Sequence, residues 1–311
     1  MVYCIIERDW CQMAKELPGE GGGGEPLPYE YFYDGAVRRK LHEFGASGVN
    51  FYDQVFRLMG YKRTDIALDV GAGMGHDGLY IASEYHPSLV LLLEPGSTDP
   101  NEDKYLPLRD EIAEKSLWGI ELLLGVAEDI PLPDATVDKA TLIHSAYEFD
   151  DLPRALGEVA RVLKDDGLGS LVTNGPEDKL RFKEFIKTSG EKLGSKAPST
   201  VSSRLDYNAA FKELSHYFPY LKLITYRDEM IITERDNRLD FYLYSYDSYR
   251  RFFEQQFISD GHWGEVRREV VEKAIRQEVE ANNGVFRDTI DMGVIYFSKT
   301  QLPDLPDAIA A

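Results

Sequence analysis

The stretch IALDVGAGMGHDGLYIA, residues 66–82, places four glycines between two apolar runs. The run before the glycines is a continuous apolar strand, and the run after them is typical of a helix. An apolar strand followed at once by a helix is the repeating unit of a parallel sheet that helices cover on both faces. Residues 66–82 therefore favour an α/β fold, provided that the unit repeats.

The unit does repeat along the chain. Leu152, Leu156, Val159 and Leu163 lie on one face of a further helix. The sequence predicts a Rossmann-like, seven-stranded, mostly parallel sheet with helices on both faces and a helical insertion before the last strand. The expected strands are residues 65–70, 88–95, 120–125, 139–146, 167–174, 220–233 and 286–299, and the helices between the early strands are residues 76–85 and 107–117.

Changes in composition divide the chain into four segments. Gly, Pro and Glu dominate residues 17–28, so residues 1–28 are expected to be a flexible N-terminal arm. Residues 29–63 are expected as a helical cap, with a break at the glycines of residues 45–48. Residues 64–174 form the expected ligand-binding core. Residues 175–311 supply the remaining strands and a helical insertion at about 238–281 that caps the sheet.

Charge and cysteine content limit the partners and the compartment. The formal charge of −19 argues against a nucleic-acid partner, because such binding depends on Lys and Arg. The two cysteines, Cys4 and Cys11, make no disulfide framework, and no apolar run is long enough to span a bilayer. We therefore expect a cytoplasmic protein without a membrane partner. The scattered histidines predict no metal site, and a homodimer is left open.

Three glycines follow the first strand where ligands bind in open α/β sheets. Glycine at Gly71, Gly73 and Gly75 would let a ligand touch the backbone, which indicates a nucleotide-like ligand. Glu94, at the end of the second strand, suits ribose hydroxyls. Because Gly73, Gly75 and Gly78 also spell G-x-G-x-x-G, a nicotinamide-dependent oxidoreductase stays open, as does a tight turn that binds nothing.

Four motifs in a fixed order narrow the choice. They are LDVGAGMG (68–75), LLLEPG (91–96), GVAEDIPLPDATVD (125–138) and LPRALGEVARVLKDDG (152–167). Together they resemble the class I S-adenosylmethionine-dependent methyltransferases, and most closely the branch that acts on small molecules and quinone-type acceptors. The resemblance covers roughly residues 64–174.

The resemblance implies S-adenosyl-L-methionine as the cofactor and assigns residues to its parts. Glu94 would accept hydrogen bonds from the ribose hydroxyls. Where the family often has an acid that contacts the adenine amino group, this chain has Val126, so that contact is lost or passes to Glu128 or Asp129. The implied cofactor residues are Asp69, Gly71, Ala72, Gly73, Gly75, Glu94, Pro95, Ala127, Glu128, Asp129 and His144.

The turn HSAYEFDD, residues 144–151, follows the fourth expected strand, where this superfamily places residues near the transferred methyl group. His144 is a candidate general base, because its ordinary pKa is near 6.5; it could equally contact the cofactor while its ring only packs. Tyr147 is a second catalytic candidate and Glu148 an acceptor-binding one. Either could instead cap the next helix.

Aromatic residues in the outer segments are candidates for acceptor binding. Tyr242 and Tyr246 belong to an aromatic stripe that could also be ordinary core, and His262 and Trp263 lie in a turn that could be surface. Tyr33, beside the arm, could fold over the cofactor or only pack on the sheet. We expect the acceptor pocket between the turn at residues 144–151 and the insertion at 238–281.

These features predict methyl transfer from S-adenosylmethionine to O, N or C of a small metabolite, in a biosynthetic pathway. Two alternatives stay open beside this prediction. One is the nicotinamide-dependent oxidoreductase. The other is a non-catalytic relative that binds the cofactor and acts through a partner chain.

Overall fold

The computed structural model describes residues 43–95, 106–114, 117–185, 205–233 and 273–309. All of these lie within one compact unit, residues 32–311. The expected arm at residues 1–28 and most of the expected insertion at 238–281 lie outside the described residues, and both stay predictions.

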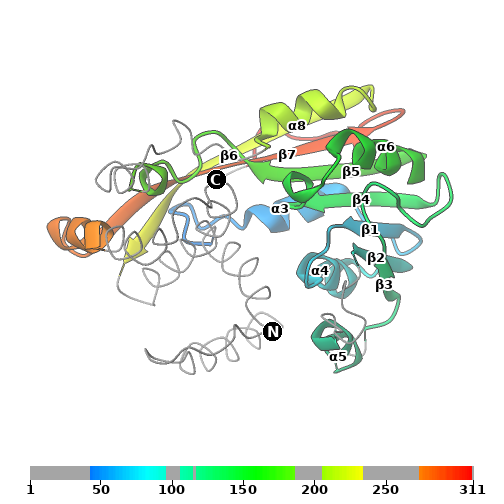
Figure 1. Cartoon of the computed structure of the whole chain (residues 1–311), viewed down its shortest axis with the longest axis horizontal. Helices are drawn as coiled ribbons and strands as arrows, with labels where there is room; N and C mark the ends of the chain where they lie inside the picture. The colour runs from blue at the N-terminus through cyan, green and yellow to red at the C-terminus, as the bar shows by residue number, and fades with distance from the viewer. Residues whose placement is uncertain (1–42, 96–105, 115–116, 186–204, 234–272, 310–311) are drawn as a thin grey trace, which may run out of the picture. The chain divides into compact units, whose positions relative to one another are not determined.

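One sheet of seven strands organises the described part of the chain (Figure 1). Its strand order is β3-β2-β1-β4-β5-β7-β6. Strands β1 to β5 pair in parallel, whereas β7 runs antiparallel to both β5 and β6. The predicted Rossmann-like, mostly parallel sheet is confirmed. The strands are β1 (Ile66–Val70), β2 (Leu89–Glu94), β3 (Ile120–Leu124), β4 (Val137–Ile143), β5 (Leu163–Asn174), β6 (Tyr220–Thr233) and β7 (Val285–Ser298).

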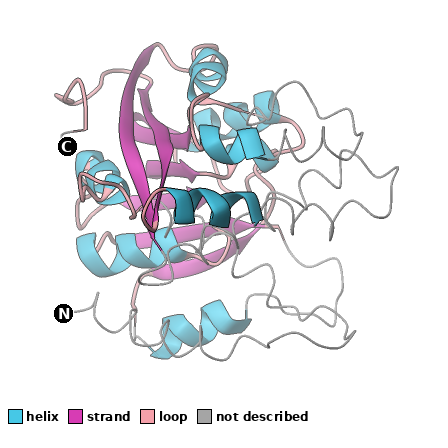
Figure 2. Cartoon of the chain, turned by 90° about the vertical axis from the view of Figure 1, so that its left-hand side faces the viewer, coloured by secondary structure: helices cyan, strands magenta, loops and turns pink. Residues whose placement is uncertain are grey.

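Helices lie on both sides of this sheet (Figure 2). Residues 180–185 and 273–281 are helical as well. The named helices are α3 (Phe51–Met59), α4 (His76–Tyr85), α5 (Leu106–Glu114), the 3₁₀ turn η1 (Ala146–Glu148), α6 (Leu152–Val162) and α8 (Tyr207–Leu214).

Two apolar clusters fill the two faces of the sheet. Ala67 of β1 belongs to the cluster that contains residues of α3 and α4, and Leu68 belongs to the cluster that contains residues of α6 and α8. Because successive side chains of a strand point to opposite faces, both must be apolar. This explains why the parallel strands have continuous apolar sequences rather than alternating ones.

The start of β5 differs from the expectation. The strand begins at Leu163 and not at Gly167, and helix α6 ends at Val162. Leu163 leaves the helical conformation with φ −70° and ψ 133° and pairs with Val137. The pairing register shifts before Lys139 meets Leu168, so an irregular, polar stretch interrupts the ladder. A pattern search for apolar runs does not detect such a stretch as strand.

The carboxyl ends of the parallel strands meet at one edge of the sheet, here called the carboxyl edge. The glycine turn follows β1 there, Glu94 ends β2, His144 follows β4 and Asn174 ends β5. Because β7 runs the other way, its first half, which includes Asp288, extends past the end of β5. The topology therefore collects most of the candidate site residues at this edge.

Candidate cofactor and acceptor site

The glycine turn is held open by its backbone conformation. Gly71, Gly73 and Gly75 have φ values of 73°, 59° and 75°, which glycine adopts without strain. The backbone N–H groups of Gly71 and Ala72 donate to the carbonyl of Leu93 at 3.0 and 3.1 Å, so the end of β2 anchors the turn. A Cβ atom at Gly73 would meet nothing within 4 Å, which leaves the approach to its backbone open.

Glu94 lies directly beside this turn. Its carboxylate accepts a hydrogen bond from the backbone N–H of Gly73, and its side chain is half-buried. The turn after β1 and the acid at the end of β2 are therefore adjacent. A ligand seated on the turn would have a carboxylate within reach.

Asp69, one residue before the end of β1, is almost completely buried. Its Oδ1 accepts a 3.4 Å hydrogen bond from the hydroxyl of Thr141, and its Oδ2 has no hydrogen-bond partner among the described residues. Burial raises the pKa of Asp69 well above its ordinary value, and the nearby Asp77 and Glu94 raise this pKa further. A cationic group on a ligand would compensate this buried carboxylate.

These observations fit S-adenosylmethionine. The cofactor has an ammonium group for the unpartnered oxygen of Asp69, ribose hydroxyls for the carboxylate of Glu94, and a body that needs an open backbone such as that at Gly73. Proteins use the same kinds of groups to hold cationic and sugar parts of nucleotide-like ligands.

The segment expected along the adenine has one engaged acid and one exposed acid. Ala127 is buried, and Glu128 accepts a 3.1 Å hydrogen bond from the backbone N–H of Asp151, at the N-terminus of α6. Asp129 is exposed, and Val126 is 45% exposed. Of the two acids, Asp129 is the more exposed, and Glu128 is the one held by the backbone of α6.

His144 takes an unusual backbone conformation, with φ 53°. Its backbone N–H donates to the carbonyl of Val172 at 3.0 Å, which ties the residue to β5. Its ring atom Nε2 lies 2.9 Å from the hydroxyl of Tyr52, a buried residue of α3. The candidate base is therefore held between two strands and a helix.

Sequence reasoning missed Tyr52 and Ser145. Tyr52 belongs to a helix that carries one apolar face, so its sequence context indicates ordinary core. Ser145 lies within the expected turn, and its hydroxyl donates to the carbonyl of Val70 at 2.6 Å, which joins the β4 turn to the end of β1. The one signal in the sequence for Ser145 was its position, as a small polar residue directly after the candidate base His144.

Tyr147 and Glu148 are placed differently from His144. Tyr147 packs against the cluster on the α6 and α8 side, whereas the ring of His144 contacts Tyr52 of α3. Glu148 is exposed in η1. Pro95, directly after β2, is exposed. The acceptor-binding candidates Tyr33, Tyr242, Tyr246, His262 and Trp263 lie outside the described residues.

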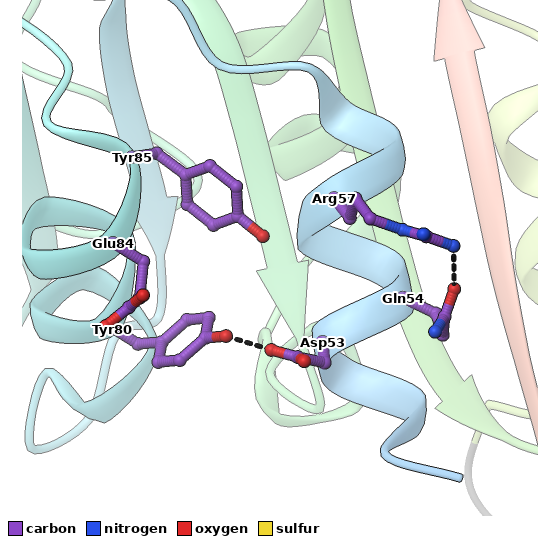
Figure 3. Close-up of a pocket in the computed structure, with 6 residues that line it drawn as sticks. All are labelled: Asp53, Gln54, Arg57, Tyr80, Glu84 and Tyr85. Atoms are coloured by element: carbon purple, nitrogen blue, oxygen red, sulfur yellow. Dashed lines mark hydrogen bonds between the residues drawn. The ribbon is translucent and has the colours of Figure 1, made fainter. Parts of the chain in front are cut away.

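A cavity of about 300 Å³ opens between α3 and α4 (Figure 3). The phenol of Tyr80 donates to the carboxylate of Asp53 across it. Two of its three α4 residues, Glu84 and Tyr85, are the last two of that helix, whereas the glycine turn precedes the first residue, so this cavity is separate from the glycine turn. It is lined by Asp53, Gln54, Arg57, Tyr80, Glu84 and Tyr85.

Two kinds of feature are absent from the described residues. There, the structure holds no group of three or more His, Cys, Asp or Glu side chains arranged to bind a metal ion. No helix in the same part of the chain is both long and apolar enough to cross a membrane.

A family model described as a methyltransferase domain matches residues 68–171. Among curated proteins, an uncharacterized methyltransferase of Bacillus subtilis, YcgJ, is 34% identical over 120 residues, which are 38% of this chain and 44% of that protein. A fatty-acid O-methyltransferase of Mycolicibacterium smegmatis is 32% identical over 100 residues, 32% of this chain and 34% of that protein. The chain thus spans about half or less of the length of the curated relatives it matches.

Solved structures share the fold. The crystal structure of YcgJ from Bacillus subtilis superposes with a TM-score of 0.52 at 19% identity and covers 80% of this chain and 97% of that one. The [4+2]-cyclase SpnF gives a TM-score of 0.52 at 14% identity and covers 91% of this chain and 100% of that one. The glycine turn and Glu94 lie within the matched segment, so residues 68–171 form a methyltransferase domain of the class I S-adenosylmethionine-dependent type.

Proposed function

We propose that this chain transfers the methyl group of S-adenosylmethionine to an oxygen, nitrogen or carbon atom of a small metabolite. The observation that carries the proposal is the unpartnered, buried oxygen of Asp69 beside the open turn at Gly73. A buried carboxylate oxygen without a partner is costly, and the ammonium group of the cofactor is the partner that this arrangement suits.

The chain's own residues orient the cofactor. Asp69 would hold its ammonium group, Glu94 would hold its ribose hydroxyls, and Ala127 and Asp129 would lie along its adenine. When bound, the cofactor supplies a sulfonium methyl group, and the transfer is an in-line displacement. The main task of the protein is therefore to hold donor and acceptor in contact geometry.

His144 serves as the general base where the acceptor arrives protonated. Its contact with Tyr52 at 2.9 Å fixes the ring near the end of β4. Deprotonation by His144 requires a neutral imidazole. Tyr147 remains a second candidate for this role, and Glu148 a candidate for acceptor binding.

Names of related proteins support a small-molecule acceptor. A malonyl-[acyl-carrier protein] O-methyltransferase of Xylella fastidiosa and a demethylmenaquinone methyltransferase of Listeria monocytogenes match parts of this chain. We extend from them only the class of small biosynthetic acceptor. The acceptor pocket would lie between residues 144–151 and the insertion at 238–281, with Tyr33, Tyr242, Tyr246, His262 and Trp263 as contacts. A cytoplasmic location and a homodimer belong to the same proposal.

Calorimetry on the full chain with two cofactors tests the proposal. We expect binding of S-adenosylmethionine and none of NAD, because residues 68–171 match a methyltransferase domain. Binding of NAD without binding of S-adenosylmethionine would overturn the proposal. Good cofactor binding with no methyl transfer to any small acceptor would favour the non-catalytic alternative.

A further inference from the structure

Asn174 ends β5 at the carboxyl edge, and its register shows which face it belongs to. Asn174 pairs with Met292 of β7, and Met292 pairs with Tyr226 of β6. Residues directly opposite in antiparallel strands share a face, as do residues two apart in one strand. Met292, Tyr226 and Val172 all belong to the cluster on the α3 side. Asn174 therefore belongs to that face as well.

Contacts on this face of the sheet connect Asn174 to the candidate base, His144. The hydroxyl of Tyr52 lies 4.0 Å from Sδ of Met292 and 2.9 Å from Nε2 of His144. His144 in turn donates its backbone N–H to Val172, two residues before Asn174. Asn174 is thus a neighbour, through Met292 and Val172, of the Tyr52–His144 pair.

The side-chain oxygen of Asn174 takes no part in these contacts. Its Oδ1 is shielded from solvent and has no hydrogen-bond partner within the described ranges. The residue as a whole keeps intermediate exposure, so it is not sealed in the core. Rotation about the terminal side-chain bond of asparagine is soft, so the amide can turn toward a ligand at little cost.

We propose that Asn174 is a specificity residue of the acceptor site, and that its amide oxygen accepts a hydrogen bond from a hydroxyl or N–H group of the methyl acceptor. The inference rests on the proposed methyltransferase function. The neighbours Val172 and Met292 are apolar, and the hydroxyl of Tyr226 is already hydrogen-bonded to Ser47 and Asp228, so the rest of the recognised group is apolar. The acceptor class is a hydroxyl or amine carried on an apolar body.

An acceptor molecule that lacks a hydrogen-bond donor should bind much more weakly beside the amide oxygen of Asn174. An acceptor without the donor would leave the amide oxygen unpaired and shielded from water. Sites built to pair a substrate hydroxyl reject analogues that lack it far better than apolar pockets reject an extra group.

A matched pair of probes, 4-octylphenol and its methyl ether 4-octylanisole, tests the inference. Both are titrated into the full chain saturated with S-adenosylhomocysteine. We expect the wild-type protein to bind the phenol at least about tenfold more tightly than the ether. Asn174→Leu, which keeps the size of the side chain but removes the amide, should bind the two about equally while its affinity for S-adenosylhomocysteine is unchanged.

Ser170→Ala is the matched control. Ser170 lies on the same face of β5 as Asn174. Within the described residues its hydroxyl, like Asn174 Oδ1, is a buried oxygen without a hydrogen-bond partner. This variant should keep the preference for the phenol. If Asn174→Leu does not fold, Asn174→Ala replaces it with the same expectation.

Three results would overturn the inference: a wild-type protein without the preference, one that binds neither probe, or an Asn174 variant that keeps the preference. Each leaves the proposed function standing as long as S-adenosylhomocysteine binds. Failure of the wild-type protein to bind S-adenosylhomocysteine would instead contradict the proposed function itself.

Discussion

Asp69 places a buried carboxylate where the fold gains nothing from it, and in the proposed function this carboxylate binds the cofactor. Its carboxylate is buried, one oxygen has no partner in the described structure, and two further acids, Asp77 and Glu94, raise its pKa together with burial. An ordinary core position would carry an apolar residue there. Functional sites commonly keep such unfavourable groups because the ligand compensates them.

The raised pKa of Asp69 gives a pH dependence with a definite sign. The folded chain holds the Asp69 proton to a higher pH than the unfolded chain, whose value is near 3.8. Above that pH the folded state binds more protons, so the free energy of unfolding falls as the pH rises through the raised value. Asp69→Asn should remove this loss and gain stability over the wild type as the pH rises, measured by urea unfolding without cofactor. Parallel pH profiles of the two proteins would contradict the pKa shift.

Glu94 is expected to act on the ligand rather than on the fold. Hydrogen bonds to a charged group contribute about 1.5–3 kcal/mol each, so Glu94→Ala should weaken S-adenosylmethionine binding by at least about tenfold. Because Glu94 is half-buried at the end of a strand, the melting temperature should change little. Glu121→Ala, an exposed acid on the adjacent strand β3, is the control. Unchanged affinity in Glu94→Ala, measured by calorimetry, would remove this residue from the site.

At the scale of elements, the sequence predicted most of the strands but neither the start of β5 nor the position of β7 in the sheet. Apolar runs located β1 to β4 within one to three residues, because buried parallel strands need apolar residues on both faces. The start of β5 was missed because Lys164, Asp165 and Asp166 are polar. The position of β7 between β5 and β6 depends on pairing between distant segments, which no local pattern encodes.

The candidate site was predictable to the same extent. The glycine turn and Glu94 come from local motifs, and the structure brings them together. The contact between Tyr52 and His144 joins residues 92 positions apart in the sequence. A tyrosine on the apolar face of a helix carries no mark of such a contact, so only the folded chain reveals it.

Two glycines of the turn should respond differently to substitution. A Cβ at Gly71 would lie 2.5 Å from Cβ of Ser145, so Gly71→Ala should destabilise the fold itself. Gly73 has open space around it, so Gly73→Val should fold with a modest conformational penalty, about 1–2 kcal/mol for its left-handed backbone. The valine side chain would nevertheless occupy the place of the cofactor. Thermal unfolding and calorimetry separate the two cases; a Gly73→Val protein that binds S-adenosylmethionine normally would mean that the ligand approaches elsewhere.

Over the whole molecule, the two halves of the sheet have different roles. Strands β1 and β2 carry Asp69 and Glu94, the proposed cofactor residues, whereas β5, β7 and β6 carry a second polar group at the carboxyl edge. There Asp178 and Lys179, just after β5, form a buried ion pair at 2.7 Å. Asp178 also accepts a 3.2 Å hydrogen bond from the backbone N–H of Asp291, and Lys179 donates its backbone N–H to Thr289, both on β7. This pair fastens the segment after β5 to β7.

Breaking this pair should destabilise the fold without changing the cofactor site. Lys179→Met would leave the carboxylate of Asp178 buried without its cation, and removing one partner of a buried pair costs about 3–5 kcal/mol. The Asp178→Asn and Lys179→Met double variant removes both charges and should be more stable than Lys179→Met alone. Urea unfolding of both single variants and the double variant measures the coupling.

Because β4 and β5 separate this pair from β1 in the sheet order, the folded Lys179→Met protein should bind S-adenosylmethionine as the wild type does. A double variant no more stable than Lys179→Met would show that the pair is not what holds this segment, and a matching loss of cofactor affinity would show that the two halves of the sheet are coupled.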